Sequence, residues 1–129
     1  MFNLKLFMLA VAAAGLSYAA PTAGSLSLSS SCSNVNFSNN LLVADCLTAA
    51  DGSTRITSSI SLNDKITNDQ GTMRWSSTGN FLSTCTACRV QPQLELNCYC
   101  KFPGGDSFQS LINLQDHIFS KAGSLVSDL

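Results

Sequence analysis

Hydrophobic and polar residues alternate with a period of two along several short segments of the chain. Residues 42–46 read Leu-Val-Ala-Asp-Cys, and residues 94–98 repeat the alternation with Leu-Glu-Leu-Asn-Cys. Successive side chains of a strand point to opposite faces, so each segment is predicted to be a half-buried β-strand. The same reasoning predicts strands at residues 54–60, 72–75, 107–112 and 124–126.

Turn signals separate these segments. Asp51-Gly52, Gly104-Gly105 and Asn68-Asp69-Gln70-Gly71 are typical of tight turns. Leu62 and Ile66 are apolar and four residues apart, which indicates one helical turn rather than a strand. No segment has the length and periodicity of a full helix. The pattern therefore predicts an all-β protein with short helical turns only.

The predicted elements occur twice in the same order. At an offset of 52 residues the identical pairs are Leu42/Leu94, Cys46/Cys98, Gly52/Gly104, Ser58/Ser110, Ile60/Ile112, Leu62/Leu114, Asp64/Asp116, Ile66/Ile118 and Gly71/Gly123. Cys32 and Cys85, which open the two copies, match at an offset of 53. We therefore predict one domain at residues 32–129, made of two tandem repeats at about 32–79 and 80–129.

The N-terminal segment, residues 1–19, has the pattern of a secretory signal peptide. Lys5 precedes an apolar run at residues 6–16, and Ser17 and Ala19 are small residues suited to a cleavage site. The apolar run is too short to span a membrane. We therefore expect a secreted, extracellular protein without a membrane anchor, in which a Ser-rich lead-in at residues 20–31 precedes the domain.

Charge and cysteine content exclude some classes of function. Without Lys5, six basic residues face eight acidic ones, a formal net charge of −2, so the basic surface that nucleic-acid binding requires is missing. Six cysteines in a small exported chain indicate a disulfide framework rather than a zinc site, and no metal or cofactor is expected. Asn36-Phe37-Ser38 is a glycosylation sequon, which makes Asn36 a candidate N-glycan acceptor.

The pairing of four of the cysteines is open at this point. Residues opposite each other in an antiparallel hairpin have a constant sum of residue numbers. This geometry favours the nested pairs Cys85–Cys100 and Cys88–Cys98 over the crossed pairs Cys85–Cys98 and Cys88–Cys100. A β-bulge shifts the register by one residue, so crossed pairing is also allowed.

The ordered set of motifs resembles the cyanovirin-N homology family from Leu28 to Leu125. Copy one contains Cys32, Leu42-Val43-Ala44-Asp45-Cys46, Gly52, Ser59-Ile60-Ser61-Leu62-Asn63, Ile66-Thr67-Asn68-Asp69-Gln70-Gly71 and Met73-Arg74-Trp75. Copy two opens with Gly79-Asn80-Phe81-Leu82-Ser83-Thr84-Cys85 and closes with Ile112-Asn113-Leu114-Gln115-Asp116-His117-Ile118.

The resemblance implies an elongated all-β molecule whose two pseudo-symmetric halves exchange hairpins. It also implies a lectin that binds glycans, notably high-mannose chains, in shallow pockets near the two ends, without catalysis, metal or cofactor. The family pairing joins Cys32 to Cys46 and Cys85 to Cys98, leaves Cys88 to bond Cys100, and is the pairing we prefer. The linker Ser76-Ser77-Thr78-Gly79 lacks the proline seen in the best-known member of the family, where this hinge permits domain swapping, so a monomer is expected.

The resemblance places one binding pocket near the turn that follows Ile66. The residues carried over to it are Asn68, Gln70, Asn80, Ser83, Thr84 and Lys101. Asn commonly closes turns by bonding backbone, so Asn68 and Asn80 have a structural alternative. At the second pocket the polar residues of the family are replaced, and we expect poor binding there. Its residues are Ser27, Ser30, Ser31, Leu47, Ala49, Ser120, Lys121 and Ala122.

The sequence thus favours a secreted carbohydrate-binding protein that recognises mannose-type or related glycans. The alternative is a disulfide-stabilised secreted effector or inhibitor that binds a protein partner and has lost its sugar pockets. An enzyme is not expected, because His117 and Asp116 occupy a place where the family has no chemistry, and no other acid-base pair is recognisable. Trp75 is expected to pack between the repeats rather than to stack on a sugar.

Overall fold

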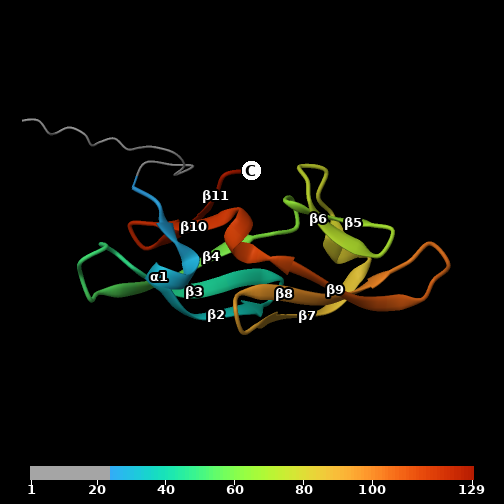
Figure 1. The fold of residues 1–129 in the computed structure, drawn as a ribbon, viewed down its shortest axis with the longest axis horizontal. Coiled ribbons are helices and arrows are strands. Elements are labelled where there is room, and N and C mark those ends of the chain that lie inside the picture. Colours follow the sequence, from blue (N-terminus) through green and yellow to red (C-terminus); the bar gives the residue numbers. More distant parts are fainter. Residues whose placement is uncertain (1–23) are drawn as a thin grey trace, which may run out of the picture.

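The computed structural model describes residues 24–129. The predicted signal peptide and the first residues of the lead-in lie outside the described residues. The described part is elongated, with a three-stranded sheet toward each end (Figure 1). Within it, no helix combines the length and the apolar character that crossing a membrane would need.

Each repeat contributes one antiparallel three-stranded sheet. The first consists of β2 (Cys32–Ser38), β3 (Leu41–Leu47) and β4 (Arg55–Ser61), and the second of β7 (Cys85–Gln91), β8 (Glu95–Lys101) and β9 (Ser107–Asn113). The inward positions of β3 and β8 are fully or nearly fully buried, and they include Leu42 and Leu96. The period-two pattern therefore predicts the central strand of each sheet correctly.

Each repeat also contributes a short hairpin after its sheet. The strands β5 (Ile66–Asp69) and β6 (Thr72–Trp75) form the first hairpin, and β10 (Ile118–Lys121) and β11 (Ser124–Ser127) form the second. A two-residue strand β1 (Leu26–Ser27) pairs with β10. One turn of α-helix, α1 (Leu28–Ser31), and two 3-10 turns, η2 (Phe81–Ser83) and η3 (Leu114–Asp116), complete the described elements.

The hairpin of each repeat packs against the sheet of the other repeat (Figure 1). The backbone N–H of Met73 in β6 donates to Ser110 Oγ in β9 at 2.9 Å, and the N–H of Leu125 in β11 donates to Ser58 Oγ in β4 at 2.8 Å. The two bonds are equivalent, because Met73 matches Leu125 and Ser58 matches Ser110 at the offset of 52. Each half of the molecule therefore bonds the hairpin of the other half. These bonds confirm the expected exchange of hairpins between pseudo-symmetric halves.

A second reciprocal pair of bonds holds the short helical elements. Leu82 N–H at η2 donates to Asn63 Oδ1 at 2.9 Å, and Ser29 N–H at α1 donates to Gln115 Oε1 at 3.0 Å. Asn63 and Gln115 stand at equivalent positions, so the longer glutamine reproduces the contact of the asparagine. The core between the halves is closed by side chains without exposed surface, namely Leu28, Leu62, Ile66, Phe81, Leu114 and Ile118.

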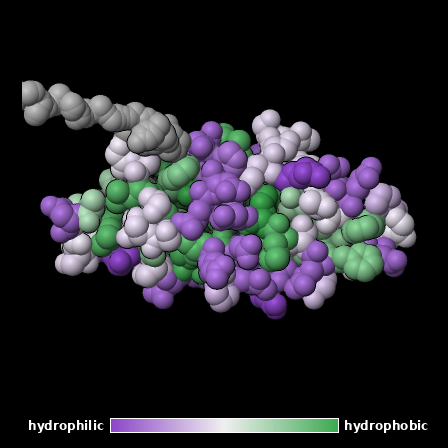
Figure 2. Space-filling model, viewed as in Figure 1, coloured by the Kyte–Doolittle hydropathy of each residue, from purple (hydrophilic) through white to green (hydrophobic). Residues whose placement is uncertain are grey.

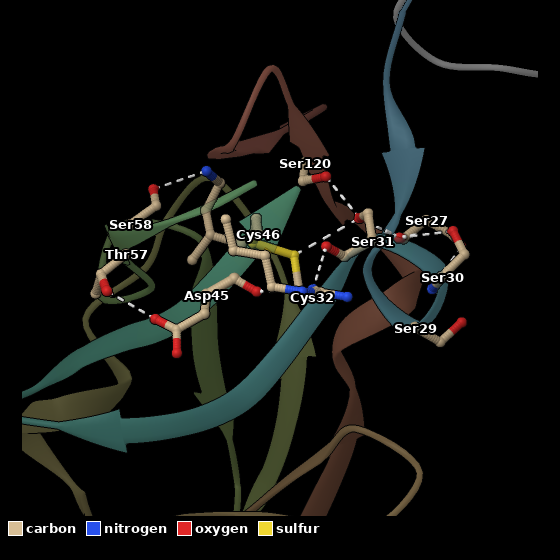
Figure 3. The surroundings of a disulfide bond; sticks show 12 residues. Ser27, Ser29, Ser30, Ser31, Cys32, Asp45, Cys46, Thr57, Ser58 and Ser120 are labelled. Atoms are coloured by element: carbon tan, nitrogen blue, oxygen red, sulfur yellow. Dashed lines mark hydrogen bonds between the residues drawn. A yellow bond between two sulfur atoms is a disulfide. The ribbon is translucent and has the colours of Figure 1, made fainter. Parts of the chain in front are cut away.

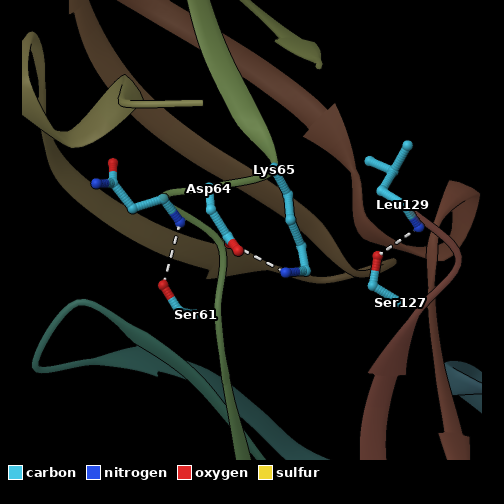
Figure 4. A network of polar contacts seen from close by, with 6 residues as sticks. Ser61, Asp64, Lys65, Ser127 and Leu129 are labelled. Atoms are coloured by element: carbon cyan, nitrogen blue, oxygen red, sulfur yellow. Dashed lines mark hydrogen bonds and ion pairs between the residues drawn. The ribbon is translucent and has the colours of Figure 1, made fainter. Parts of the chain in front are cut away.

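The single-turn prediction for residues 62–66 is correct, since Ile66 N–H donates to Leu62 O at 3.1 Å. Neighbouring polar contacts hold this segment after β4 (Figure 4). Lys65 Nζ lies 3.0 Å from Asp64 Oδ1, and this hydrogen bond lowers the pKa of the Asp64 carboxyl. Because Asp64 is largely exposed, the ion pair contributes little to stability.

The disulfide pairing corrects one expectation. The bridges are Cys32–Cys46, Cys85–Cys100 and Cys88–Cys98, so the crossed pairing that we preferred from the family resemblance is wrong and the nested pairing is right. The reason is the register of β8 on β9. Leu96 lies opposite Ile112 as Leu42 lies opposite Ile60, which makes Leu96 the equivalent of Leu42 at an offset of 54, not 52.

The shift also explains the two additional cysteines. At the offset of 54, Cys100 is the equivalent of Cys46, and Cys98 occupies the position of Ala44. The connection at residues 102–106 is two residues shorter than its counterpart at 48–54, which restores the offset of 52 for the strands that follow. Cys88 corresponds to Val35, so the third disulfide stands at positions where the first repeat has two apolar residues, Val35 and Ala44.

Trp75 packs within the fold, as expected. Its ring is partly buried and meets the His117 ring edge to face, with centroids 5.0 Å apart. His117 Nδ1 lies 2.7 Å from Asp128 Oδ1. The only histidine of the chain therefore pairs with Asp128 near the C-terminus and not with its neighbour Asp116.

Candidate functional site

Four of the six residues predicted for the first pocket line one open cavity of about 370 Å³. Asn68 comes from β5, Gln70 from the turn between β5 and β6, Thr84 from the residue after η2, and Lys101 from the end of β8. The exchanged hairpin of repeat one and the sheet of repeat two thus meet at this cavity. Its remaining lining comes from the β8–β9 connection, through Phe102, Pro103 and Gly105.

Asn68 joins the exchanged hairpin of repeat one to the sheet of repeat two through its side-chain amide. Its amide Nδ2 donates to Thr84 Oγ1 at 2.9 Å and to the Lys101 carbonyl at 3.0 Å, and its Oδ1 accepts the Gly71 N–H at 2.7 Å. Both amide hydrogens are therefore used within the protein. The structural alternative holds for Asn68, which closes the turn and also orients the neighbouring groups.

The Thr84 hydroxyl accepts one hydrogen bond and donates none within residues 24–129. Its Oγ1 accepts from Asn68, and residues 24–129 offer no acceptor for its hydrogen. Because a hydroxyl is both a donor and an acceptor, the free half of this group is the donor. Thr84 is only partly exposed, so a ligand in the cavity would be the natural acceptor.

Gln70 and Lys101 supply the other polar groups of the cavity. Both are exposed, and neither side chain forms a hydrogen bond or ion pair with any other residue of the described chain. Gln70 has a left-handed backbone with φ 54°, which places its side chain at the tip of the turn. Around one cavity the chain thus presents a hydroxyl donor, an amide with both functions and a cation.

Asn80 and Ser83 do not line this cavity. Asn80 lies before η2 in a left-handed conformation with φ 74°, and its exposed side chain makes no capping bond. Ser83 Oγ donates to the Asn80 carbonyl at 2.9 Å, which closes the short helical turn. The structure therefore brings together four of the predicted residues and leaves these two on the adjoining turn.

The opposite end of the molecule has the equivalent residues in a closed arrangement (Figure 3). Ser120 corresponds to Asn68 and Ser31 to Thr84, and their hydroxyls lie 2.6 Å apart. Ser31 Oγ also donates to the Ser27 carbonyl at 2.6 Å. Both serines are completely buried, so neither offers a group to solvent. The equivalents of Lys101 and Gln70 are apolar here, Leu47 and Ala122.

The aromatic part of the cavity was missed by the sequence analysis. Phe102 follows Lys101 directly and is 43% exposed, and Phe108 at the start of β9 is 53% exposed. The signal in the sequence was Phe-Pro-Gly-Gly, an apolar aromatic beside a turn where polar residues are usual. No group of three or more metal-binding side chains comes together within residues 24–129.

Comparison with known proteins agrees with this architecture. The model of the CVNH domain matches residues 28–126. Among solved structures, the CVNH protein of T. borchii is 28% identical over 79% of this chain and 99% of its own, with a TM-score of 0.68. Microvirin, solved with mannobiose, is 27% identical over 79% of this chain and 98% of its own, with a TM-score of 0.65.

A further structure has the same fold at lower identity. The MoCVNH3 variant Mo0v, solved in complex with (N-GlcNAc)4, is 22% identical over 81% of this chain and 97% of its own, with a TM-score of 0.70. The family model spans nearly all of the described residues, and the exchanged hairpins are present in full. The chain belongs to the CVNH domain family.

Proposed function

We propose that this protein is a secreted carbohydrate-binding protein, a lectin, that holds a glycan in the cavity lined by Asn68, Gln70, Thr84 and Lys101. The observation that carries the proposal is that the Thr84 hydroxyl donor, the Gln70 amide and the Lys101 ammonium are unpaired within the described residues and lie around one open cavity. A pyranose presents neighbouring hydroxyls, each both a donor and an acceptor. The Thr84 hydroxyl, the Gln70 amide and the Lys101 ammonium can meet such groups together.

The ligands of the relatives support a sugar as the occupant. Microvirin binds mannobiose, and the MoCVNH3 variant binds (N-GlcNAc)4. Each hydrogen bond to a sugar contributes only about 0.5–1.5 kcal/mol, because water competes for the same groups. A mannose-type or related oligosaccharide that contacts several of these groups therefore binds weakly at a single cavity.

In this proposal, the protein has one working sugar site per molecule. Ser31 and Ser120 satisfy each other at the opposite end, and Leu47 and Ala122 replace the cation and the amide found in the cavity. A monomer with a single site gains nothing from the joint binding of two sites to one glycan. Binding is therefore expected with a stoichiometry of one.

The proposed role involves no catalysis. His117 bonds Asp128 and packs on Trp75, and it does not line the cavity. The cavity itself contains no carboxylate and no histidine among its lining residues. Recognition by hydrogen bonds and shape accounts for the groups that are present.

Calorimetric titration with mannobiose and with an N-acetylglucosamine tetramer tests the proposal. Thr84→Val and Lys101→Met keep side-chain volume and remove one polar group each, so each is expected to weaken binding about 2- to 12-fold. Arg89→Met removes an exposed cation on β7 that lies outside the cavity lining, and it serves as the matched control. Its affinity should equal that of the wild type.

Two results would contradict the proposal. One is a folded wild-type protein, with an intact circular dichroism spectrum and a cooperative thermal transition, that binds neither sugar. The other is binding that Thr84→Val and Lys101→Met leave unchanged. If a protein captured from an extract stays bound in excess free sugar while no sugar binds directly, the effector alternative replaces the lectin proposal.

A further inference from the structure

Phe102 in the β8–β9 connection lines the cavity beside its polar groups, and the exposed ring of Phe108 at the start of β9 packs against it. We propose that Phe102, supported by Phe108, is a stacking platform for a pyranose ring. We further propose that this platform makes the cavity select β-linked N-acetylglucosamine oligomers over α-linked mannose. The inference rests on the proposed function and names the ligand of the same site.

The two rings form an ordered pair at the end of the molecule. Their centroids lie 5.0 Å apart with planes inclined at 63°, an edge-to-face arrangement that aromatic pairs prefer. Figure 2 shows hydrophobic atoms at the surface of the end formed by the β8–β9 hairpin. Single exposed apolar residues are common, but here two exposed rings are in contact and one of them, Phe102, lines the cavity.

Phe102 is fixed in place before any ligand arrives. A Cβ atom at Gly71 would overlap Phe102 Cε1 and Cδ1, so the ring lies directly against the glycine of the exchanged hairpin. The Phe102 N–H donates to the Asp106 carbonyl at 2.7 Å, and its own carbonyl accepts the Gly105 N–H at 2.9 Å. A ring held in this way loses little conformational entropy when a sugar stacks on it.

The opposite end shows that packing alone does not require aromatic rings. Thr48 and Ile56 occupy the positions equivalent to Phe102 and Phe108, and a Cβ atom at Gly123 would contact both of them, as one at Gly71 contacts Phe102. Aliphatic side chains therefore suffice to cover this glycine. The aromatic pair occurs only at the end that also presents the Thr84 and Lys101 groups.

The stereochemistry of sugars decides which ligand such a platform suits. A β-linked N-acetylglucosamine has all its ring substituents equatorial, so both faces present axial C–H groups to an aromatic ring. An α-linked mannose has an axial O1 on one face and an axial O2 on the other. A polar axial oxygen over the Phe102 ring loses its water without gaining a hydrogen bond. The platform thus favours the first sugar and penalises the second.

Titration of the full secreted chain with an N-acetylglucosamine tetramer and with α-linked mannobiose tests the inference. The wild type should bind the tetramer more tightly than mannobiose. Phe102→Leu keeps the apolar contact with Gly71 and removes the aromatic face, so it should weaken tetramer binding about tenfold and change mannobiose binding by less than about twofold. Phe102→Trp should retain tetramer binding, whereas Ile56→Leu at the other end serves as the control without effect.

A measurement on the unaltered protein covers the case in which a variant does not fold. In NMR, the ring current of Phe102 should shift the resonances of the axial sugar protons upfield when the tetramer binds. The same protons should receive strong saturation transfer from the protein. Equal affinity of Phe102→Leu and wild type, absence of the upfield shift, or tighter binding of mannobiose overturns the inference. If Lys101→Met still weakens binding in that case, the carbohydrate-binding function stands. A wild type that binds neither sugar rejects both.

Discussion

Gly71 offers the sharpest test of how the exchanged hairpin is held. Its backbone has φ 97°, a region that L-residues avoid, and an added methyl group would overlap the Phe102 ring. Gly71→Ala therefore combines two costs. The left-handed backbone costs about 1–2 kcal/mol for a residue with a Cβ, and forcing an extra methyl into a filled contact costs about 1–3 kcal/mol. We expect a loss of about 2–5 kcal/mol in the free energy of unfolding.

The chain contains a matched control for the backbone part of this cost. Gly105 has φ 98°, and an added Cβ there would meet no atom within 4 Å. Gly105→Ala is thus expected to lose only the conformational cost of about 1–2 kcal/mol. The difference between the two variants isolates the contact with Phe102, since the two glycines have nearly the same φ.

A double-mutant cycle with Phe102→Ala completes the test. Removing the ring makes room for the methyl group, so Gly71→Ala in the Phe102→Ala background should cost no more than Gly105→Ala. Urea denaturation followed by Trp75 fluorescence gives the four free energies, with the disulfides kept oxidised throughout. If Gly71→Ala costs the same as Gly105→Ala, or if Phe102→Ala does not relieve it, the close contact between hairpin and platform is refuted.

The remaining predictions concern the third disulfide and a surface carboxylate. Cys88→Val combined with Cys98→Ala removes the bridge and gives repeat two the residue types that repeat one has at Val35 and Ala44. The bridge spans 10 residues, for which loop entropy gives about 2.7 kcal/mol. Because Cys85–Cys100 already restricts the loop, urea denaturation should show a smaller loss, and an unchanged stability would contradict a structural role. Hydrogen bonds from Asn34 and Thr57 lower the pKa of the Asp45 carboxyl below its ordinary value. The stabilisation from Asp45 is present above the pKa that the carboxyl has in the unfolded chain, and it is lost as pH falls through the lower folded pKa. Asp45→Asn should therefore flatten the decline of stability in acid, and an unaltered pH profile would argue against those bonds.

The repeat was readable from the sequence because glycines and buried apolar positions recur at fixed intervals. Ser58 and Ser110 matched at the offset of 52, and both proved to bond the hairpin of the other half. The short strands β5 and β10 were not predicted, because four residues such as Ile66–Asp69 show too little alternation. Their pairing is decided by the turn that joins them to the next strand and by packing on the other repeat.

The sequence analysis assigned β8 an offset of 52 instead of 54, and this error has a definite physical source. Leucines stand at 94 and 96 and cysteines at 98 and 100, so a shift of two residues leaves every side chain on the same face. A period-two pattern cannot distinguish such registers. The length of the β8–β9 connection distinguishes them, and that length became known only from the structure. The disulfide pairing followed the register, and so did the position of Phe102 beside the cavity.

The two ends of the molecule differ in the length of the side chain at one equivalent position, Asn68 at one end and Ser120 at the other. Asn68 spans from its strand to the Thr84 hydroxyl and the Lys101 carbonyl, and the Thr84 hydroxyl keeps its donor function for a ligand. At the equivalent place Ser120 is shorter and bonds Ser31 directly, and both hydroxyls are buried. The same fold therefore produces an open polar cavity at one end and a closed contact at the other. Because the aromatic pair also lies at the open end, binding and selectivity are expected to depend on that end alone.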